Sequence, residues 1–391
     1  MQRLRTTSVS IQYYRDTVSL GGARITNQTL GVVSRSRGQT QGILGLGPTL
    51  RGPSPYSLVL SSMAEQGLIH ARVFSLDLRR AGAASGAVVY GGVDRARFSG
   101  SLERCAMVRG AEGERRLAVK LAAVGVSAGD GGPSRRWSIG SSASASASGS
   151  DKDDANVMLD SGTTSSRLHA DIAMPLLEAL GAGDAGPDGY YPVSCARAAA
   201  SKGTVDFTFG RKTIRVPMTD FVLNMSAVDG SGGGGSNGSD ECYAGVVLTE
   251  SQQILGDSVL RAGYFVFDWD NEAVHVAQAA DCGAEADIVA VPRSGVPLNL
   301  DGRCSENEAA VTPGPTSSLQ PVATPSGAYT TVYTVSSCPA FERGCETGAV
   351  VTRTVAPVPS ASAHDNAGAR IGAVTRNLAA VVGACTALLL L

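Results

Sequence analysis

The chain has 391 residues, of which 43% are apolar and 17% are charged, with a net charge of −2. This length can hold two domains plus appendages, and the near-neutral charge argues against a nucleic-acid partner. The eight cysteines form no Cys-x-x-Cys pair and have no neighbouring histidines. Their spacing argues against zinc or thioredoxin-like chemistry and favours disulfides in an oxidising compartment.

Residues 8–46 alternate in a β manner. A Gly21-Gly22 pair between two alternating runs predicts a turn, and apolar residues spaced along 54–67 predict a short helix. Further strands are predicted at residues 9–20, 28–33, 73–78 and 87–92.

Later in the chain the same pattern recurs around two tracts, 139–150 and 230–240. Both tracts are rich in Gly and Ser, with Ala in the first and Asn in the second, and are predicted to be flexible surface insertions. A helix is predicted at about 171–180. Strands are predicted at 205–209, 213–216, 265–268 and 273–276, the last two joined as a hairpin.

Asp160 follows the apolar run 157–159 and precedes Ser161, Gly162, Thr163 and Thr164. A carboxylate at the tip of such a turn can accept hydrogen bonds from the Gly162 amide and from nearby hydroxyls. We interpret it as one half of the pair of acids that activates water in an aspartic peptidase. The alternative is an ordinary turn, which the Asp-Ser-Gly-Thr sequence also forms often.

One internal repeat is visible. Ile43-Leu44-Gly45 and Ile254-Leu255-Gly256 both read as a strand that ends in an apolar-apolar-glycine step, followed by a turn and a helix-like segment. A molecule with two related lobes would produce this repeat.

With these features in place, the chain resembles pepsin-like aspartic endopeptidases from about residue 10 to 282. The resemblance is carried by five segments in the family's order, namely Tyr13–Val32, Gly42–Gly47, Phe74–Leu102, Asp160–Thr164 and Ile254–Gln278. It implies an all-β, bilobal fold with a partial N-terminal lobe at 1–97 and a complete C-terminal lobe at 98–282. The Ser/Thr-rich stretch and apolar tail beyond it are similar to fungal surface members such as the yapsins.

The resemblance also implies roles. Asp160 would be catalytic; Ser161, Gly162 and Thr163 would support its loop, and Thr164 would begin the substrate contacts. Cys195 and Cys242 fall where the family's C-lobe disulfide lies, whereas the pairing of the other cysteines stays open. The family implies polypeptide substrates and neither metal nor cofactor.

The family's first Asp-Thr-Gly loop and its flap have no counterpart, because Asp160-Ser161-Gly162 is the single Asp-(Ser/Thr)-Gly sequence. Asp16-Thr17-Val18 lacks the glycine and reads as structural. We therefore expect an endopeptidase whose first catalytic Asp and flap are missing from this chain, which would be truncated at its N-terminus. Two alternatives stay open: a non-catalytic cell-surface or cell-wall glycoprotein, and a peptide-binding module.

Several signals concern the compartment. Asn27, Asn224 and Asn237 begin Asn-x-Ser/Thr sequons. Residues 283–366 form a Pro/Ser/Thr/Val-rich stretch, predicted to be a stalk outside the fold. Residues 367–391 combine small residues, a polar spacer and a short apolar tail, the pattern of a glycosylphosphatidylinositol (GPI) signal with attachment at Asn366; the alternative is a frayed apolar terminus. A GPI signal also requires entry into the secretory pathway, yet the N-terminus shows no signal peptide. We expect a monomer on the cell surface or cell wall, anchored to the plasma membrane.

Overall fold

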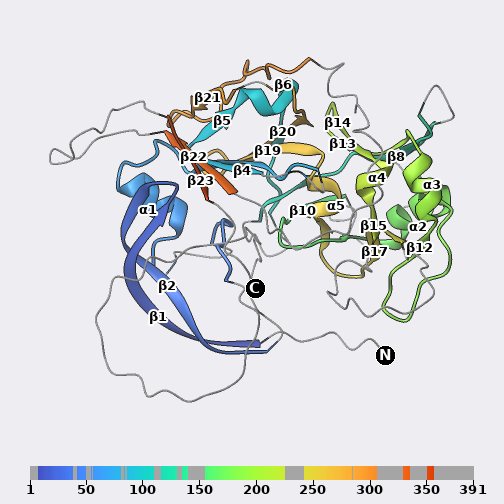
Figure 1. Ribbon diagram of the computed structural model, residues 1–391, viewed down its shortest axis with the longest axis horizontal. Coiled ribbons are helices and arrows are strands. Elements are labelled where there is room, and N and C mark those ends of the chain that lie inside the picture. The colour runs from blue at the N-terminus through green and yellow to red at the C-terminus, as the bar shows by residue number, and fades with distance from the viewer. Residues whose placement is uncertain are drawn as a thin grey trace.

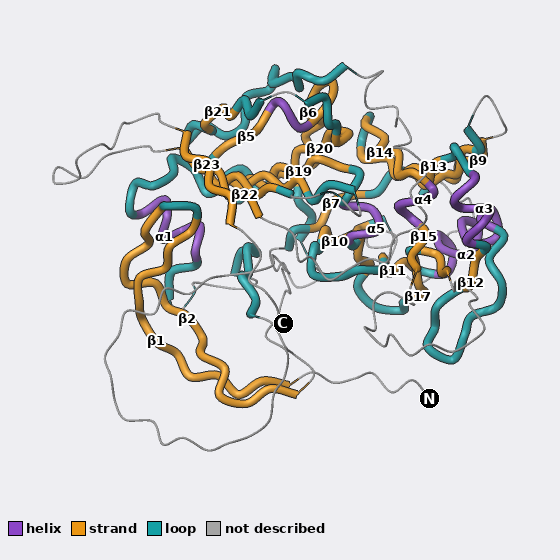
Figure 2. Tube along the Cα trace, viewed as in Figure 1, coloured by secondary structure: helices purple, strands orange, loops and turns teal. Residues whose placement is uncertain are grey.

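The computed structural model describes the chain in segments: residues 8–37, 42–49, 54, 56–80, 83, 86–109, 116–129, 134–139, 155–224, 242–283 and 285–305, with the backbone of 329–334 and 350–355. Several predicted features lie outside these residues: the tract 139–150 except for its first residue, the tract 230–240, Asn237, Asn366 and the GPI signal. Strands dominate the described part, and the helices are few and short (Figure 2). The all-β expectation is met.

A long two-stranded ribbon begins the described chain (Figure 1). It consists of β1 (Ser8–Leu20) and β2 (Ala23–Arg37), which pair antiparallel around the predicted Gly21-Gly22 turn. Both glycines have positive φ, which suits a tight turn. Helix α1 (Val59–Glu65) packs on the ribbon within the predicted 54–67 segment.

A seven-stranded sheet occupies the middle of the molecule, in the order β23-β22-β4-β3-β19-β20-β6. Strands from both predicted lobes contribute to it, because β3 pairs with β19 across almost two hundred residues. The strands are β3 (Val73–Asp77), β4 (Ala87–Tyr90), β6 (Phe98–Ala106), β19 (Gly263–Asp268), β20 (Ala273–Ala279), β22 (Tyr329–Thr334) and β23 (Val350–Val355).

Three further sheets build the C-terminal lobe. One has the order β17-β11-β18-β10-β7, with β7 (Ala118–Lys120), β10 (Asn156–Leu159), β11 (Ser166–Leu168), β17 (Val246–Leu248) and β18 (Gln253–Leu255). A second has the order β14-β13-β8-β9, with β8 (Ala123–Ser127), β9 (Ser134–Ser138), β13 (Thr204–Phe209) and β14 (Lys212–Pro217). A third has the order β12-β16-β15, with β12 (Pro192–Val193), β15 (Val222–Asn224) and β16 (Cys242–Ala244). The helices are α2 (Ala170–Leu180), α3 (Cys195–Ala200), α4 (Met218–Phe221) and α5 (Asp257–Leu260).

Two large apolar cores support these sheets, beside a small third cluster of Ala198, Val222 and Cys242. The larger contains Phe207, Phe209, Phe265 and Phe267 and extends from the C-terminal lobe to the ribbon and α1. The alternation of β19 divides its side chains between the cores, because Tyr264 and Val266 point into the smaller one. The shared sheet therefore joins the two halves through packing on both of its faces.

The repeat predicted from Ile43-Leu44-Gly45 and Ile254-Leu255-Gly256 is realised on one side only. Gln253–Leu255 forms β18, but residues 42–49 adopt no regular secondary structure. The prediction of a strand at 42–46 was therefore wrong. A strand needs a neighbouring strand to receive its backbone hydrogen bonds, and this segment is paired with none of the described strands.

Residues beyond Cys282 also differ from expectation, because the predicted stalk begins inside the fold. Ile288–Ala290 forms β21, which pairs antiparallel with β5 (Gly92–Asp94), just before the 3-10 helix η1 (Arg95–Arg97). Val291, Val296 and Leu300 are buried in the smaller core. Composition alone concealed these contacts, because a few apolar residues spread along a Pro- and Ser-rich stretch carry no β periodicity.

Candidate active site

The Asp160 loop begins where β10 ends. Strand β10 runs parallel to β18, and this pairing brings Leu159 opposite Leu255. The Asp160 amide then donates a hydrogen bond to the Leu255 carbonyl oxygen at 3.0 Å. Asp160 is consequently only 5% exposed at the end of a buried strand.

Both carboxylate oxygens of Asp160 accept hydrogen bonds from its own loop. The Gly162 amide donates to Oδ1 at 2.9 Å, and the Thr163 hydroxyl donates to Oδ2 at 2.6 Å. Hydrogen bonds to an ionised acceptor are short and strong. The loop therefore holds an oriented carboxylate, in the arrangement that the sequence predicts for Asp160, Gly162 and Thr163.

The loop rests on the segment that follows β18. Asp257 and Ser258, at the start of α5, donate their amides to the carbonyl oxygens of Thr163 at 2.7 Å and Thr164 at 3.0 Å. A Cβ atom at Gly256 would lie 2.1 Å from the Thr163 oxygen, so only glycine permits this approach. The apolar-apolar-glycine step of the sequence thus supports the Asp160 loop.

A pair of buried serines fixes the same junction. The Ser166 and Ser258 hydroxyls lie 2.9 Å apart; the Gly256 amide donates to Ser166 at 3.1 Å, and Ser258 donates to the Gly245 carbonyl at 2.7 Å. The sequence analysis missed both residues. Their signal was faint, because each is a single hydroxyl beside an apolar strand or helix.

Asp257 adds a second acid next to the loop. Burial raises the pKa of Asp257 to about 6, an effect that Arg261 opposes and that the nearby Asp160 charge reinforces. Arg261 contacts Asp257 Oδ2 at 3.3 Å, and Oδ1 has no hydrogen-bond partner among the described residues. Asp257 thus lies against the Asp160 loop and is paired with Arg261 on its own helix.

The other predicted site residues are distributed as follows. Ser161, predicted to support the loop, is partly exposed, and Thr164, predicted to begin the substrate contacts, is exposed. His169 precedes α2, where its Nε2 lies 2.9 Å from the Ser251 carbonyl oxygen. Asp16 lies in β1 and accepts a hydrogen bond from the Thr17 amide, which suits a structural role.

Two disulfides stabilise the described fold. Cys195 and Cys242 are bonded, the pairing that the resemblance implies. Cys282 and Cys304, which the sequence left unassigned, form the second bond across 22 residues. Cys105 is the one cysteine in the described part without a disulfide.

Two of the three sequon asparagines lie in the described part. Asn27 is exposed and adopts a positive φ in β2, which leaves room for a glycan. Asn224 is 9% exposed at the end of β15, where it pairs with Cys242. A glycan on Asn224 would require this side chain to leave its buried position.

The described residues hold no group of three or more His, Cys, Asp or Glu side chains arranged for a metal ion. None of the helices within the described ranges combines the length and the apolar character needed to cross a bilayer.

Comparisons with known proteins agree with this geometry. The family profile "Asp: Eukaryotic aspartyl protease" matches residues 5–279. Secreted aspartic protease 8 of Candida albicans is 36% identical over 267 residues, covering 68% of this chain and 55% of that protein. Candidapepsin-1 of Candida albicans (strain WO-1) is 31% identical over 271 residues, 68% of this chain and 60% of that protein. The chain thus spans little more than half the length of these relatives.

Among solved structures, the crystal structure of aspartic proteinase from Irpex lacteus superposes with a TM-score of 0.53 at 21% identity. The match covers 72% of this chain and 81% of that chain. At this identity the likeness establishes the fold, which is all-β and bilobal.

Proposed function

Because this chain belongs to the eukaryotic aspartyl protease family, we propose that it carries the Asp160 half of an aspartic endopeptidase that hydrolyses peptide bonds in proteins. The observation that carries the proposal is the doubly hydrogen-bonded Asp160 carboxylate at the end of β10. A carboxylate held in this way has one orientation, from which it can accept a proton from water.

Peptide hydrolysis by this route needs two carboxyl groups. The ionised one takes a proton from the attacking water, and a protonated one polarises the scissile carbonyl. The 391 residues contain a single Asp-(Ser/Thr)-Gly sequence, and Asp257, which is paired with Arg261 at 3.3 Å, lacks the glycine turn that holds Asp160. We propose that the second catalytic aspartate and the flap belong to a segment that this sequence does not contain.

The test compares two purified forms on a denatured protein substrate at about pH 4, each with and without a pepstatin-type inhibitor. One form is the 391-residue chain, and the other is extended to include a second Asp-Thr-Gly loop. We expect the extended form to cleave and the 391-residue chain to be inactive, because loss of one member of a jointly acting pair removes nearly all the rate.

Asp160→Asn in the extended form should abolish cleavage, whereas Asp171→Asn, at an exposed position in the first turn of α2, should retain it. Inhibitor-sensitive cleavage by the 391-residue chain would overturn the need for a missing partner. Full activity of the Asp160→Asn variant would overturn the assignment of Asp160.

We further propose that the protein works outside the cell, attached to the surface through a GPI anchor at Asn366. The disulfides, the sequons and the secreted relatives support an oxidising compartment. Treatment of cells that express the whole protein with a phosphatidylinositol-specific phospholipase should release it into the medium. The attachment site is tested by a variant that combines Asn366→Gln with replacement of the neighbouring small residues. Retention of this variant on the cells would contradict the proposed site.

The single Asp-(Ser/Thr)-Gly loop also supports a second candidate, a non-catalytic surface glycoprotein that retains the protease framework. Inactivity of both forms in the cleavage experiment, with the fold intact, would favour it.

A further inference from the structure

Arg79 stands out because its backbone adopts the left-handed region, with φ of 60°. A non-glycine residue pays a cost there and stays only where its surroundings hold it. Arg79 follows β3 in the middle of the molecule, and its side chain is 16% exposed. Its position is therefore enforced by contacts rather than by local preference.

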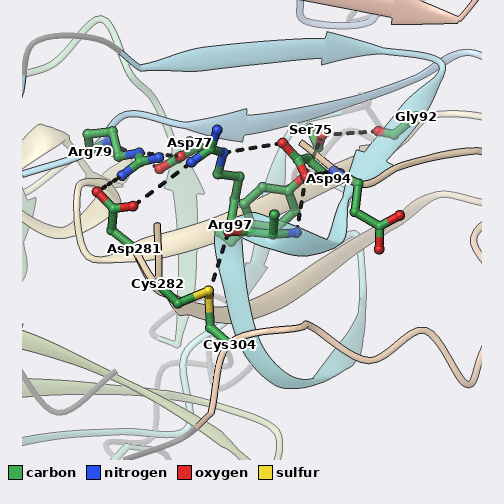
Figure 3. A network of polar contacts seen from close by, with 12 residues as sticks. Ser75, Asp77, Arg79, Gly92, Asp94, Arg97, Asp281, Cys282 and Cys304 are labelled. Atoms are coloured by element: carbon green, nitrogen blue, oxygen red, sulfur yellow. Dashed lines mark hydrogen bonds and ion pairs between the residues drawn. A yellow bond between two sulfur atoms is a disulfide. The ribbon is translucent and has the colours of Figure 1, made fainter. Parts of the chain in front are cut away.

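Two carboxylates hold the guanidinium of Arg79 (Figure 3). Nε lies 2.7 Å from Oδ2 of the buried Asp77, and Nη1 contacts Oδ2 of Asp281. Asp281 also lies within 4.0 Å of Arg97 Nη1, and Arg97 Nε is 3.2 Å from Asp94. Figure 3 shows that Asp281, which directly precedes Cys282, contacts both Arg79 and Arg97.

Asp281 is the first residue of the segment 281–305, which we call the strap and which is fixed to the rest of the fold. The Cys282–Cys304 disulfide closes the strap, its strand β21 pairs with β5, and its side chain Val291 is buried. The family profile ends at residue 279, so the strap lies outside the matched region.

The carbonyl oxygen of Arg79 connects to the active-site loop. It accepts a hydrogen bond from Arg261 Nη1 at 3.4 Å, while Nη2 of the same guanidinium contacts Asp257 Oδ2 at 3.3 Å. The Asp257 amide, in turn, is bonded to Thr163 of the Asp160 loop at 2.7 Å. One chain of polar contacts thus runs from the strap to the loop.

We propose that Arg79 is a positioning residue for the Asp160 loop, held by the strap through Asp281 and acting through Arg261 on Asp257. The left-handed backbone turns the Arg79 carbonyl toward Arg261, and the paired carboxylates keep it there. This inference rests on the proposed function for its catalytic meaning, but the coupling itself exists in the folded chain.

The titration of Asp257 reports this coupling directly. The charged groups around Asp257 are Arg261 on its own helix and Asp160 on the loop. Beyond Arg261 lies Asp220. Burial raises the pKa of Asp220, and the charges of Arg80 and Arg261 oppose this shift. A looser Arg261 would withdraw positive charge from Asp257, so the pKa of Asp257 would rise.

The experiment follows the Asp257 carboxyl carbon by NMR as the pH is varied in the folded 391-residue chain. Arg261→Gln gives the full size of the effect. Asp281→Asn and Arg79→Gly should each move the Asp257 midpoint upward by roughly a few tenths of a pH unit or more. Glycine accepts the left-handed backbone without strain, so Arg79→Gly removes the guanidinium without forcing the turn to refold.

Asp287→Asn is the matched control. Asp287 is also a strap carboxylate paired with arginines, at 3.0 Å from Arg303 and 3.5 Å from Arg95, and within the described residues its carboxylate forms no ion pair with Arg79. We expect this variant to keep the wild-type midpoint. An unchanged midpoint in both Asp281→Asn and Arg79→Gly, or in Arg261→Gln, would overturn the inference.

Asp281 is 64% exposed, so the Asn variant should fold; melting curves at each pH verify that the compared states are native. Because the titration needs no peptide cleavage, an inactive chain would count against the proposed function alone.

Discussion

The Cβ position of Gly256 lies 2.1 Å from the carbonyl oxygen of Thr163, so the end of β18 is in backbone contact with the loop that carries Asp160. The contact belongs to one member of an internal sequence repeat. At the other member, Gly45, no atom of the described residues other than its chain neighbours lies within 4 Å of the Cβ position. The two glycines occupy equivalent positions in the repeat, yet a side chain could be added at Gly45 and not at Gly256.

Gly256→Ala should destabilise the protein and displace the loop, because the methyl group would overlap backbone atoms that cannot rotate away. We expect a loss of about 1–3 kcal/mol, the usual cost of overpacking. Urea unfolding measures it. Gly45→Ala is the control and should change stability by less than about 0.5 kcal/mol; equal effects would contradict the asymmetry.

Thr163→Val should remove the 2.6 Å hydrogen bond to Asp160 Oδ2 while keeping the shape of the side chain. Hydrogen bonds to charged groups contribute about 1.5–3 kcal/mol, so we expect a loss of that order in the free energy of unfolding at pH 7. Thr163→Ser keeps the hydroxyl and should recover most of it. A Val variant as stable as the Ser variant would show that the bond contributes nothing.

His275 should make the fold sensitive to acid. Burial lowers the pKa of His275 to about 4 from an ordinary value of 6.5, with Asp268 opposing and Arg104 reinforcing the shift. Because the unfolded chain takes up the proton first, this contribution is full above pH 6.5 and is lost as the pH falls toward 4.

We therefore expect His275→Gln to lack this part of the decline in melting temperature between pH 6.5 and 4. His70→Gln replaces an exposed histidine and should keep the wild-type slope. Parallel pH profiles for wild type and His275→Gln would contradict the role of burial.

Asp77 should act in the opposite direction. Burial raises the pKa of Asp77 to about 6, although Arg79 and Arg97 oppose the shift. A raised folded-state pKa gives stability that is full below the ordinary value of 3.8 and is lost as the pH rises through about 6.

Asp77→Asn stays neutral throughout this window. Relative to wild type, its free energy of unfolding should therefore improve between pH 4 and pH 7, whatever its absolute value. Denaturant titrations at the two pH values give the difference. A difference that stays constant or moves the other way would show that Asp77 is ionised in the fold at pH 4.

Loss of the Cys282–Cys304 disulfide should weaken the strap. A loop of 22 residues corresponds to about 3 kcal/mol of chain entropy. The double serine variant should lose stability of that order, and protease should cut it first between residues 283 and 304. Cleavage elsewhere, with the strap intact, would show that β21 and the buried Val291 suffice to hold it.

Local sequence determined much of the fold and the central loop. The β1–β2 hairpin, the hairpin of β19 and β20, and α2 appear where alternation and helical spacing predict them, because turn glycines and periodicity act within a few residues. The hydrogen bonds of the Asp160 carboxylate lie within the loop itself, so this arrangement was also readable from the sequence.

Only the tertiary structure decided which segments meet. Ile43-Leu44-Gly45 has the same local pattern as Ile254-Leu255-Gly256, yet only the second finds neighbouring strands, and a strand exists only through such partners. The Ser166–Ser258 pair and the contact of Asp281 with Arg79 join residues about ninety and two hundred positions apart. No periodicity in the sequence encodes such distances, because they arise from how the sheets pack.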